Sequence, residues 1–321
     1  MPSSSPLASP QITALPTATS SPPALPRTQV DFSCRLPVYT RDGTQVKDSF
    51  IDFPNLAATA AGQGGIYYDR PIARWLPVTR QAVSPEGTRY AFTEGWSAEQ
   101  PAAPRVHIVD ASSGADIRVV SMPDAQPYVV ADYTAGGVYV VIRADTAAPG
   151  VWRIDPNKGS VAKVSAAYYQ PAGPGFIGAV DRRDPSPYKS ALSGQEQPNR
   201  IDRRDARGRA VSWLYQPGRG LAWVVLPGPA LLVMGRSRDE TQRAEQVEFW
   251  LVEGPGRWTR LAAYSGSDPS PYRELEDGFG NAIADAHGTW IGTASGLYLM
   301  TPDAVLLRVL DQPAYPANTC A

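Results

Sequence analysis

The chain has few of the residues on which most catalytic and metal sites depend. Among its 321 residues are two histidines, His107 and His287, and two cysteines, Cys34 and Cys320. No Ser, His and Asp set suggests a shared geometry, and a zinc site or a histidine-based lyase dyad would lack its ligands. His107 occupies a strand position that elsewhere holds a large aromatic residue, and His287 lies in a tight turn. We therefore expect no catalytic histidine, no metal and no cofactor.

An excess of one charge and long apolar runs are also missing. The 30 basic and 31 acidic residues give a net charge of −1 and are spread along the chain without a basic run. We expect no nucleic-acid partner, because such a partner requires a clustered positive surface. No window approaches eighteen consecutive apolar residues, so we expect no transmembrane helix. The N-terminus lacks the basic start and apolar core of a secretion signal, although a cleaved signal would leave no trace.

The first 29 residues differ in composition from the rest of the chain. Residues 1–29 are almost entirely Pro, Ser, Thr, Ala and Leu, which cannot bury a core and favour extended chain. We expect a disordered linker at 1–29 and one domain at 30–321. A linker before a domain with two cysteines fits a secreted or cell-surface protein whose export signal, or lipid anchor, lies outside this sequence. The alternative is a disordered cytosolic tail ahead of two unpaired thiols.

Short β-rich runs separated by Gly, Pro, Asn and Asp turns recur throughout the chain, whereas helical periodicity is hard to find. This pattern is typical of an all-β sandwich, barrel or propeller. A repeat decides among them. A strand that runs into a turn recurs at intervals of 45, 50, 48 and 48 residues, in VHIVDASSG, VWRIDPNKG, IDRRDARG, FWLVEGPG and LYLMTPDA, which begin at Val106, Val151, Ile201, Phe249 and Leu297. A more divergent copy, IYYDRPIAR, begins at Ile66, 40 residues before the first of these.

This period, with about four strands in each repeat, indicates an all-β, six-bladed β-propeller of four-stranded blades. The fourth blade is the weakest, because no second strand is visible between FIGAVDRR and NRIDRRD. Two motifs carry a family resemblance. SPEGTRYAF at 84–92 resembles the TolB-type, WD40-like propeller repeat, and DAHGTWIGTASGLY at 285–298 resembles the blade repeat of two-component regulator propellers. The resemblance implies a bacterial, extracytoplasmic propeller and no particular activity, because propellers host many functions.

The two cysteines lie at the two ends of the predicted ring. Cys34 lies at the start of the predicted domain and Cys320 is the last residue but one, so we expect a single disulfide that joins the first strand to the last residues. The sixth blade supplies all four of its own strands in the sequence. We therefore expect the ring to lack the strand exchange that commonly closes propellers, and the disulfide to take over that role.

Loop lengths distinguish the two faces of the ring. Turns between the first and second strands of a blade, and between the third and fourth, are short and rich in glycine. The other connections are long and gather on what we call the long-loop face, made by residues 94–104, 122–128, 143–150, 166–175, 184–198, 236–246 and 265–280.

Binding sites usually lie on loops held by a rigid scaffold, so the long-loop face is the expected partner surface. Its aromatic and arginine side chains are of the types enriched at interface hot spots. The candidate partner-binding residues are Trp96, Tyr128, Tyr168, Tyr169, Tyr188, Arg236, Tyr272 and Arg273. The alternative is that these aromatics only fix their own loops to the ends of the blades.

Two short motifs each occur twice. DPSPY occurs at 184–188 and 268–272, either as a pair of matched contacts with tyrosines turned outward or as a turn sequence reused by chance. DRRD begins at Asp181 and at Asp202, and its alternating charge indicates a solvated strand edge.

We predict a monomeric, non-catalytic, extracytoplasmic binding or scaffold module with a protein, peptide or glycan partner. The alternative is a carbohydrate-active propeller of the hydrolase or lyase type. Glu274, Glu276 and Asp277 would then meet Asp184 across the mouth of the ring, since two carboxylates suffice for glycoside hydrolysis. A largely structural surface protein is a third interpretation. Convergent carboxylates at the mouth would favour the enzyme, and an open aromatic rim would favour the binding module.

Overall fold

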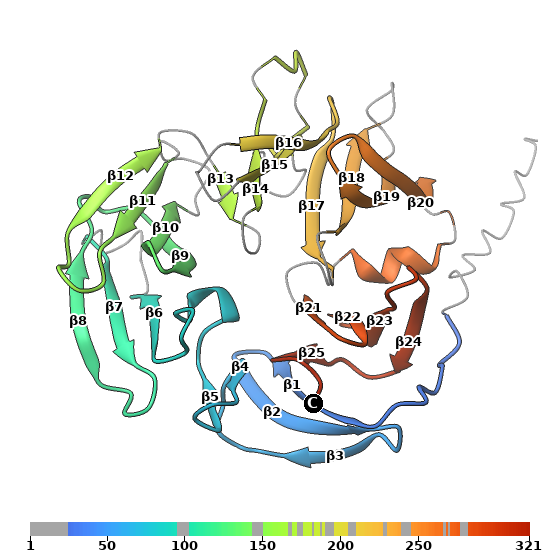
Figure 1. Cartoon of the computed structure of the whole chain (residues 1–321), viewed down its shortest axis with the longest axis horizontal. Coiled ribbons are helices and arrows are strands. Elements are labelled where there is room, and N and C mark those ends of the chain that lie inside the picture. The colour runs from blue at the N-terminus through green and yellow to red at the C-terminus, as the bar shows by residue number, and fades with distance from the viewer. Residues whose placement is uncertain are drawn as a thin grey trace, which may run out of the picture.

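Six antiparallel blades stand around a common centre in the computed structural model of the chain, which confirms the predicted all-β propeller (Figure 1). The candidate residues Trp96 and Tyr168, and residues 1–24 of the expected linker, lie outside the part of the chain that the structure describes. The described residues are 25–94, 103–142, 150–165, 169–171, 176–181, 183–186, 188–189, 196–204, 210–226, 230–238, 245–265, 268, 270–276 and 282–321.

The first three blades differ in how they obtain their innermost strand. Blade 1 consists, in sheet order, of β25 (Tyr315–Pro316), β1 (Cys34–Asp42), β2 (Gln45–Phe53) and β3 (Ala57–Ala60). Blade 2 consists of β6 (Arg89–Thr93), β7 (Arg105–Asp110) and β8 (Asp116–Ser121), with Val83 bridged to Tyr90 at the edge of β6. Blade 3 consists of β9 (Tyr128–Thr134), β10 (Gly137–Ile142), β11 (Val151–Ile154) and β12 (Val161–Ser165).

The last three blades each use four strands that are consecutive in the chain. Blade 4 consists of β13 (Tyr169–Pro171), β14 (Phe176–Ala179), β15 (Arg200–Arg204) and β16 (Ala210–Tyr215). Blade 5 consists of β17 (Gly220–Val225), β18 (Leu231–Arg238), β19 (Glu245–Gly254) and β20 (Arg257–Ser265). Blade 6 consists of β21 (Ala282–Asp285), β22 (Gly288–Gly292), β23 (Leu297–Met300) and β24 (Leu306–Leu310). Figure 1 shows β9, β17, β21 and β25 nearest the centre and β3, β8, β12, β20 and β24 at the rim.

Two of the repeated turns share one hydrogen-bond pattern, which explains why the repeat is visible in the sequence. The Asp110 carboxylate accepts hydrogen bonds from the backbone N–H groups two and three residues further on, and Gly114 follows with a φ of +75°. Asp155 and Gly159 repeat this arrangement in the next blade, again with a φ of +75° at the glycine. A short carboxylate reaches these N–H groups, and glycine adopts the left-handed backbone without a steric penalty.

Two strand assignments made from the sequence are wrong. The segment at Ile66 is not a copy of the repeat, because it forms a separate hairpin of β4 (Tyr67–Asp69) and β5 (Arg74–Leu76) outside the blades. In blade 4, FIGA forms the second strand rather than the first. The first strand is the three-residue β13, which begins at the candidate residue Tyr169 in what we expected to be a long connection. A strand this short, which ends in proline, has no periodicity to reveal it.

The ring closes in two ways. Cys34 and Cys320 form the expected disulfide, with their Cα atoms 5.5 Å apart. β25 also pairs with β1, so the C-terminal segment supplies the innermost strand of blade 1. Blade 6 does supply its own four strands, but the expectation that strand exchange would be absent is wrong. The exchange takes place one blade further on, through the two-residue strand Tyr315–Pro316.

Hydrogen bonds also hold the C-terminal residues at the junction of blades 1 and 6. The Asp285 carboxylate accepts hydrogen bonds from the backbone N–H of Cys320 at 2.8 Å and from the indole N–H of Trp290 at 2.7 Å. The backbone N–H of Arg35 donates to the carbonyl oxygen of Ala321 at 2.7 Å. Because Trp290 is fully buried in the core shared by blades 1 and 6, these bonds tie the end of the chain to that core.

Both histidines have aromatic partners. His107 stacks on Phe92 with a centroid distance of 4.7 Å, and its two ring nitrogens each lie 3.1 Å from a carboxylate, those of Glu94 and Asp116. His287 stacks on Phe32 with a centroid distance of 4.0 Å. The helices described, η1 (Arg80–Ala82) and η2 (Pro271–Leu275), have 3 and 5 residues and are far too short to cross a membrane.

Blades pack through apolar clusters that draw on neighbouring sheets. Val106 and Ile108 of blade 2 pack with Val138 and Val140 of blade 3, and all four are fully buried. Similar clusters join blades 4 and 5, 5 and 6, and 6 and 1. The hydrophobic contacts between sheets therefore continue around these parts of the ring and supply most of its stability.

Glycine makes room for tryptophan within blade 5. A Cβ atom added at Gly235 would lie 2.3 Å from the ring of Trp250, which is 1% exposed. We expect Gly235→Ala to lower the free energy of unfolding by about 1 to 3 kcal/mol, because the buried ring must move. Urea unfolding checks this. Gly136→Ala is the control, since its Cβ would have no neighbour nearer than 3.4 Å, and it should change stability by less than about 0.5 kcal/mol.

The disulfide closes a loop over a sequence separation of 286 residues, so its loss should destabilise the fold. The chain-entropy relation gives an upper value of about 5 to 6 kcal/mol, and residual structure in the unfolded chain reduces this to about 2 to 4 kcal/mol. Urea unfolding of the wild type with and without dithiothreitol, and of the double variant Cys34→Ser, Cys320→Ser, measures the effect. Dithiothreitol should leave the double variant unchanged. An unmoved wild-type transition would contradict a stabilising role.

Candidate functional site

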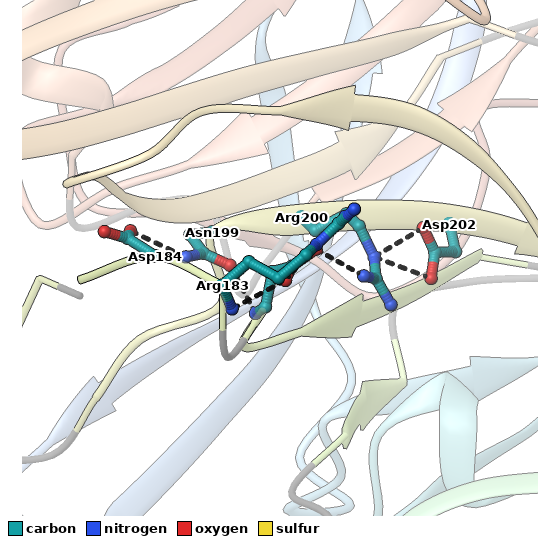
Figure 2. Close-up of polar contacts among 6 residues, drawn as sticks. Arg183, Asp184, Asn199, Arg200 and Asp202 are labelled. Atoms are coloured by element: carbon teal, nitrogen blue, oxygen red, sulfur yellow. Dashed lines mark hydrogen bonds and ion pairs between the residues drawn. The ribbon is translucent and has the colours of Figure 1, made fainter. Parts of the chain in front are cut away.

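The long-loop face of blade 4 holds a polar network with buried carboxylates (Figure 2). Asp181, Asp184 and Asn199 lie on the connection between β14 and β15, and Arg200 and Asp202 belong to β15. Asp181 is 4% exposed, Asp184 6% and Asn199 0%. The two aspartates are the ends of the first DRRD motif, so the interpretation of that motif as a solvated strand edge is wrong.

Asp181 is the centre of the network. Its carboxylate accepts hydrogen bonds from Arg183 Nε at 2.9 Å and Nη2 at 2.6 Å, and from Arg200 Nη1 at 2.7 Å. These bonds, foremost those from Arg183, hold the pKa of Asp181 well below its usual range. Arg200 Nε also lies 3.0 Å from the carboxylate of Asp202. Two arginines and two aspartates thus balance one another and fix the start of the loop to β15.

Asp184 joins its own loop to the connection between blades 4 and 5. Its carboxylate accepts a hydrogen bond from the Asn199 side chain at 2.8 Å and another from the backbone N–H of Gly218 at 2.7 Å. Gly218 lies on the connection to blade 5, and the Asn199 side chain also accepts from the backbone of Asp181 at 2.7 Å. Burial raises the pKa of Asp184, but the hydrogen bonds from Gly218, Ser186 and Asn199 outweigh it and the pKa is lowered.

Tyrosine hydroxyls on this face are bound to carboxylates. Tyr188 donates to Glu245, and its ring fills the space beside Gly220, where an added Cβ would lie 2.4 Å from it. Burial and then the hydrogen bond to Glu245 raise the pKa of Tyr188 to about 12. Tyr264 donates to Glu276 at 2.7 Å, and burial with this bond raises its pKa as well. Tyr188, on the loop of blade 4, therefore packs against blade 5 and helps to hold the two blades together.

Both candidate arginines, Arg236 and Arg273, contact groups near Tyr264 and Glu276. Arg236 donates to Glu276 at 2.8 Å. Arg273 lies over the ring of Tyr264, 5.2 Å from its centroid, and donates to the backbone oxygen of Asp268 at 2.8 Å. Glu276 thus binds Arg236 and Tyr264 together, which joins blade 5 to the connection that leads to blade 6.

Two further predicted tyrosines pack into the core. Tyr128 is 3% exposed, donates its hydroxyl to Asp124 and meets Trp152 edge-to-face at 4.9 Å. Burial, followed by the bond to Asp124, raises the pKa of Tyr128. Tyr272 is half-buried against Phe249, with ring centroids 5.1 Å apart. These placements leave the two rings little surface for a partner.

The two DPSPY copies do not present matched tyrosines. Tyr188 in the first copy is 8% exposed, and Tyr272 in the second is half-buried. In the first copy Asp184 accepts from the backbone N–H of Ser186 at 3.0 Å. In the second, Ser270 accepts from the backbone N–H of Tyr272 at 3.3 Å and caps η2. The shared sequence forms two different turns, which contradicts the interpretation as a pair of outward contacts.

The carboxylates of this face bind nearby donors. Glu274 accepts from the Ser295 hydroxyl at 3.3 Å, while Asp184 and Glu276 bind the donors given above. Asp277 lies outside the described residues. Among the described residues, no contact joins Asp184 to Glu274 or Glu276, and no group of His, Cys, Asp and Glu side chains is arranged to hold a metal ion. The geometry therefore gives no support to the two-carboxylate enzyme.

Arg183 and Tyr215 are the exposed members of the network, and sequence reasoning missed both. The Arg183 side chain is 78% exposed although it binds Asp181, and its guanidinium lies 5.9 Å from the centroid of the Tyr215 ring. Tyr215, the last residue of β16, is 37% exposed. The duplicated DRRD motif was the available signal for Arg183, but no pattern in the sequence places Tyr215 beside it.

No protein-family model matches the chain, and no curated protein matches it either. Among solved structures, the chain is similar to TolB from Acinetobacter baumannii, with 13% identity over 90% of this chain and 68% of that one and a TM-score of 0.44. It is also similar to an uncharacterised protein, lmo1340, from Listeria monocytogenes EGD-e, with 10% identity over 94% of this chain and 88% of that one and a TM-score of 0.38.

The lowered pKa of Asp184 makes the stability of this loop sensitive to acid. A carboxylate whose folded pKa lies below its unfolded value, about 3.9, stabilises the fold above that pH and loses its contribution as the pH falls through the folded pKa. We expect Asp184→Asn to be less stable than the wild type at pH 7, and this difference to shrink as the pH falls from 5 to 2. Urea unfolding across this range measures it.

The exposed Asp303 provides the control for the acid experiment. The stability difference between wild type and Asp303→Asn should stay nearly constant from pH 5 to pH 2. A difference for Asp184→Asn that is equally constant would show that its hydrogen bonds do not favour the charged carboxylate.

Proposed function

We propose that this chain is a non-catalytic, extracytoplasmic binding or scaffold module whose long-loop face binds a protein, peptide or glycan partner. The observation that carries the proposal is the Asp181 network, which holds the exposed Arg183 beside the exposed Tyr215. Side chains that are fixed before a partner arrives lose less conformational entropy on binding. Arginine and tyrosine are also the residue types that contribute most at interface hot spots.

The charges of this loop favour a partner that offers carboxylates. Arg183 and Lys189 are exposed, whereas Asp181 and Asp184 of the same loop are buried and bound within the protein. Acidic peptides and glycans with acid groups both carry such carboxylates. Arg183 binds Asp181 through Nε and Nη2, so among the described residues its Nη1 group is left to meet such carboxylates.

The extracytoplasmic location is supported by the disulfide, because such bonds persist in oxidising compartments and are rare in the cytosol. The proposal places the domain outside the cytoplasm as a monomer behind an N-terminal linker. It attributes no cofactor, metal or nucleic-acid partner to the domain. A partner on the long-loop face would then approach from the side on which the long connections gather.

An array of peptides and glycans that differ in carboxylate content tests this function. We expect wild-type protein to bind carboxylate-rich spots, and Arg183→Ala and Tyr215→Ala each to weaken binding at least about tenfold, because loss of a hot-spot residue costs about 1.4 kcal/mol or more. Titration by biolayer interferometry against the strongest spot gives the ratio of dissociation constants.

Arg257→Ala is a matched control, because Arg257 is an exposed arginine at the short turn between β19 and β20, away from the long-loop face. It should bind as the wild type does, and thermal melts should show all three variants folded. Binding that Arg183→Ala and Tyr215→Ala leave unchanged, or a preference for neutral spots, would contradict the proposed surface.

A further inference from the structure

The outermost strand of blade 1 differs from the other five outer strands. An outer strand exposes a row of unpaired backbone groups, and proteins usually protect it with a bulge or a charged side chain. β8, β12, β16, β20 and β24 each pair with the preceding strand through a register shift. β3 pairs with β2 without one. A bulge twists a strand and breaks its regular spacing, so only β3 has the regular edge of a template.

The side chains of β3 do not protect its edge either. Its four residues are Ala, Ala, Thr and Ala, and all four are exposed. Charged residues occur in β8, β12, β20 and β24, while β16 lacks them but has the bulge. β3 is therefore the single outer strand among the described blades with neither protection.

The hydrogen bonds to β2 identify which groups of β3 point outward. The backbone N–H of Ala61 donates to the oxygen of Asp48, the residue opposite it. Opposite pairs in an antiparallel ladder alternate between bonded and non-bonded. Thr59 therefore faces β2, whereas Ala58 and Ala60 direct their N–H and C=O groups to the open side. Among the described residues, no backbone hydrogen bond reaches these four groups.

The same molecule contains an extended segment on another outer edge. Thr28 donates its backbone N–H to the oxygen of Arg308 in β24 at 2.7 Å, and Arg27 forms a parallel bridge with Arg308. Residues ahead of β1 thus add to the rim of blade 6 as a short extra strand. An outer edge of this propeller accepts an extended peptide even where a bulge and an arginine are present.

We infer that the outer edge of β3 is a second binding site, which takes an extended, uncharged peptide segment of a partner protein as a fifth strand of blade 1. Small side chains at 57–60 leave room on both faces of the sheet for large residues of the peptide, which would give the site its affinity. A second copy of this chain fits less well, because four small residues cannot bury the roughly 800 Å² per partner that a stable dimer needs. This site is separate from the long-loop face.

Residue-resolved amide exchange by NMR tests the site, with the peptide Ac-KTVTVTVK-NH2 as the probe, in which the pairing segment TVTVTV is uncharged and the terminal lysines serve only for solubility. In the free protein, the amides of Ala58 and Ala60 should exchange fast and that of Thr59 slowly. With about 1 mM peptide, the exchange rates of the Ala58 and Ala60 amides should fall about tenfold, because about nine-tenths of the protein is then bound, while that of Thr59 stays unchanged. Unchanged exchange at Ala58 and Ala60 would overturn the inference.

Two matched controls separate edge pairing from other binding. Ala58→Pro removes one outward N–H without touching the ladder to β2 and should weaken peptide binding at least about tenfold with little change in melting temperature. Thr59→Val should bind as the wild type does. A probe with N-methyl groups along one edge, which needs no variant, should not bind. Equal binding by that probe, or a wild-type dimer that Ala58→Pro dissociates in sedimentation, would overturn the peptide assignment.

Discussion

Closure of the ring at blade 1 is the constraint on which the rest of the structure depends. Each blade buries its faces only because a neighbour stands on either side, so a ring with an open seam would expose two apolar faces at once. Here the seam is held by the pairing of β25 with β1, by the bond between Cys34 and Cys320, and by Asp285, which binds the end of the chain to Trp290. A backbone pairing, a disulfide and a hydrogen bond therefore all hold the same C-terminal segment against blades 1 and 6.

In the described part of the long-loop face, the polar side chains bind one another. Asp181 and Asp184 bind the loop of blade 4 to its own strand and to the next connection, and Glu276 gathers Arg236 and Tyr264. Buried carboxylates are tolerated only when such donors surround them. Among the described residues of this face, Asp181, Asp184 and Glu276 are thus engaged within the protein, while Arg183 and Tyr215 are exposed.

Much of the architecture could be predicted because the turns repeat. Asp110 and Gly114 recur as Asp155 and Gly159, and the apolar strands before them are long enough to show in the sequence. β13 and β25 could not be found, because strands of two or three residues that include proline carry no period. The Asp184 network could not be predicted from the sequence for another reason. Its partners Asn199 and Gly218 lie 15 and 34 residues away, and burial of a carboxylate follows from that convergence rather than from the DRRD motif itself.

The link between Cys34 and Cys320 also determines how the domain responds to mechanical tension. A pull on the chain ahead of Leu25 first loads the contacts of Leu25 and Thr28 with Arg308, and then the packing of Val30 and Phe32 against the core shared by blades 1 and 6. The tension then reaches Cys34, where the covalent bond passes it directly to Cys320. β1 cannot be drawn out of the ring, so the length released is limited to the residues before Cys34. Tension between the two termini therefore bypasses the sheets, and the propeller can hold its shape under load that would otherwise unravel it blade by blade.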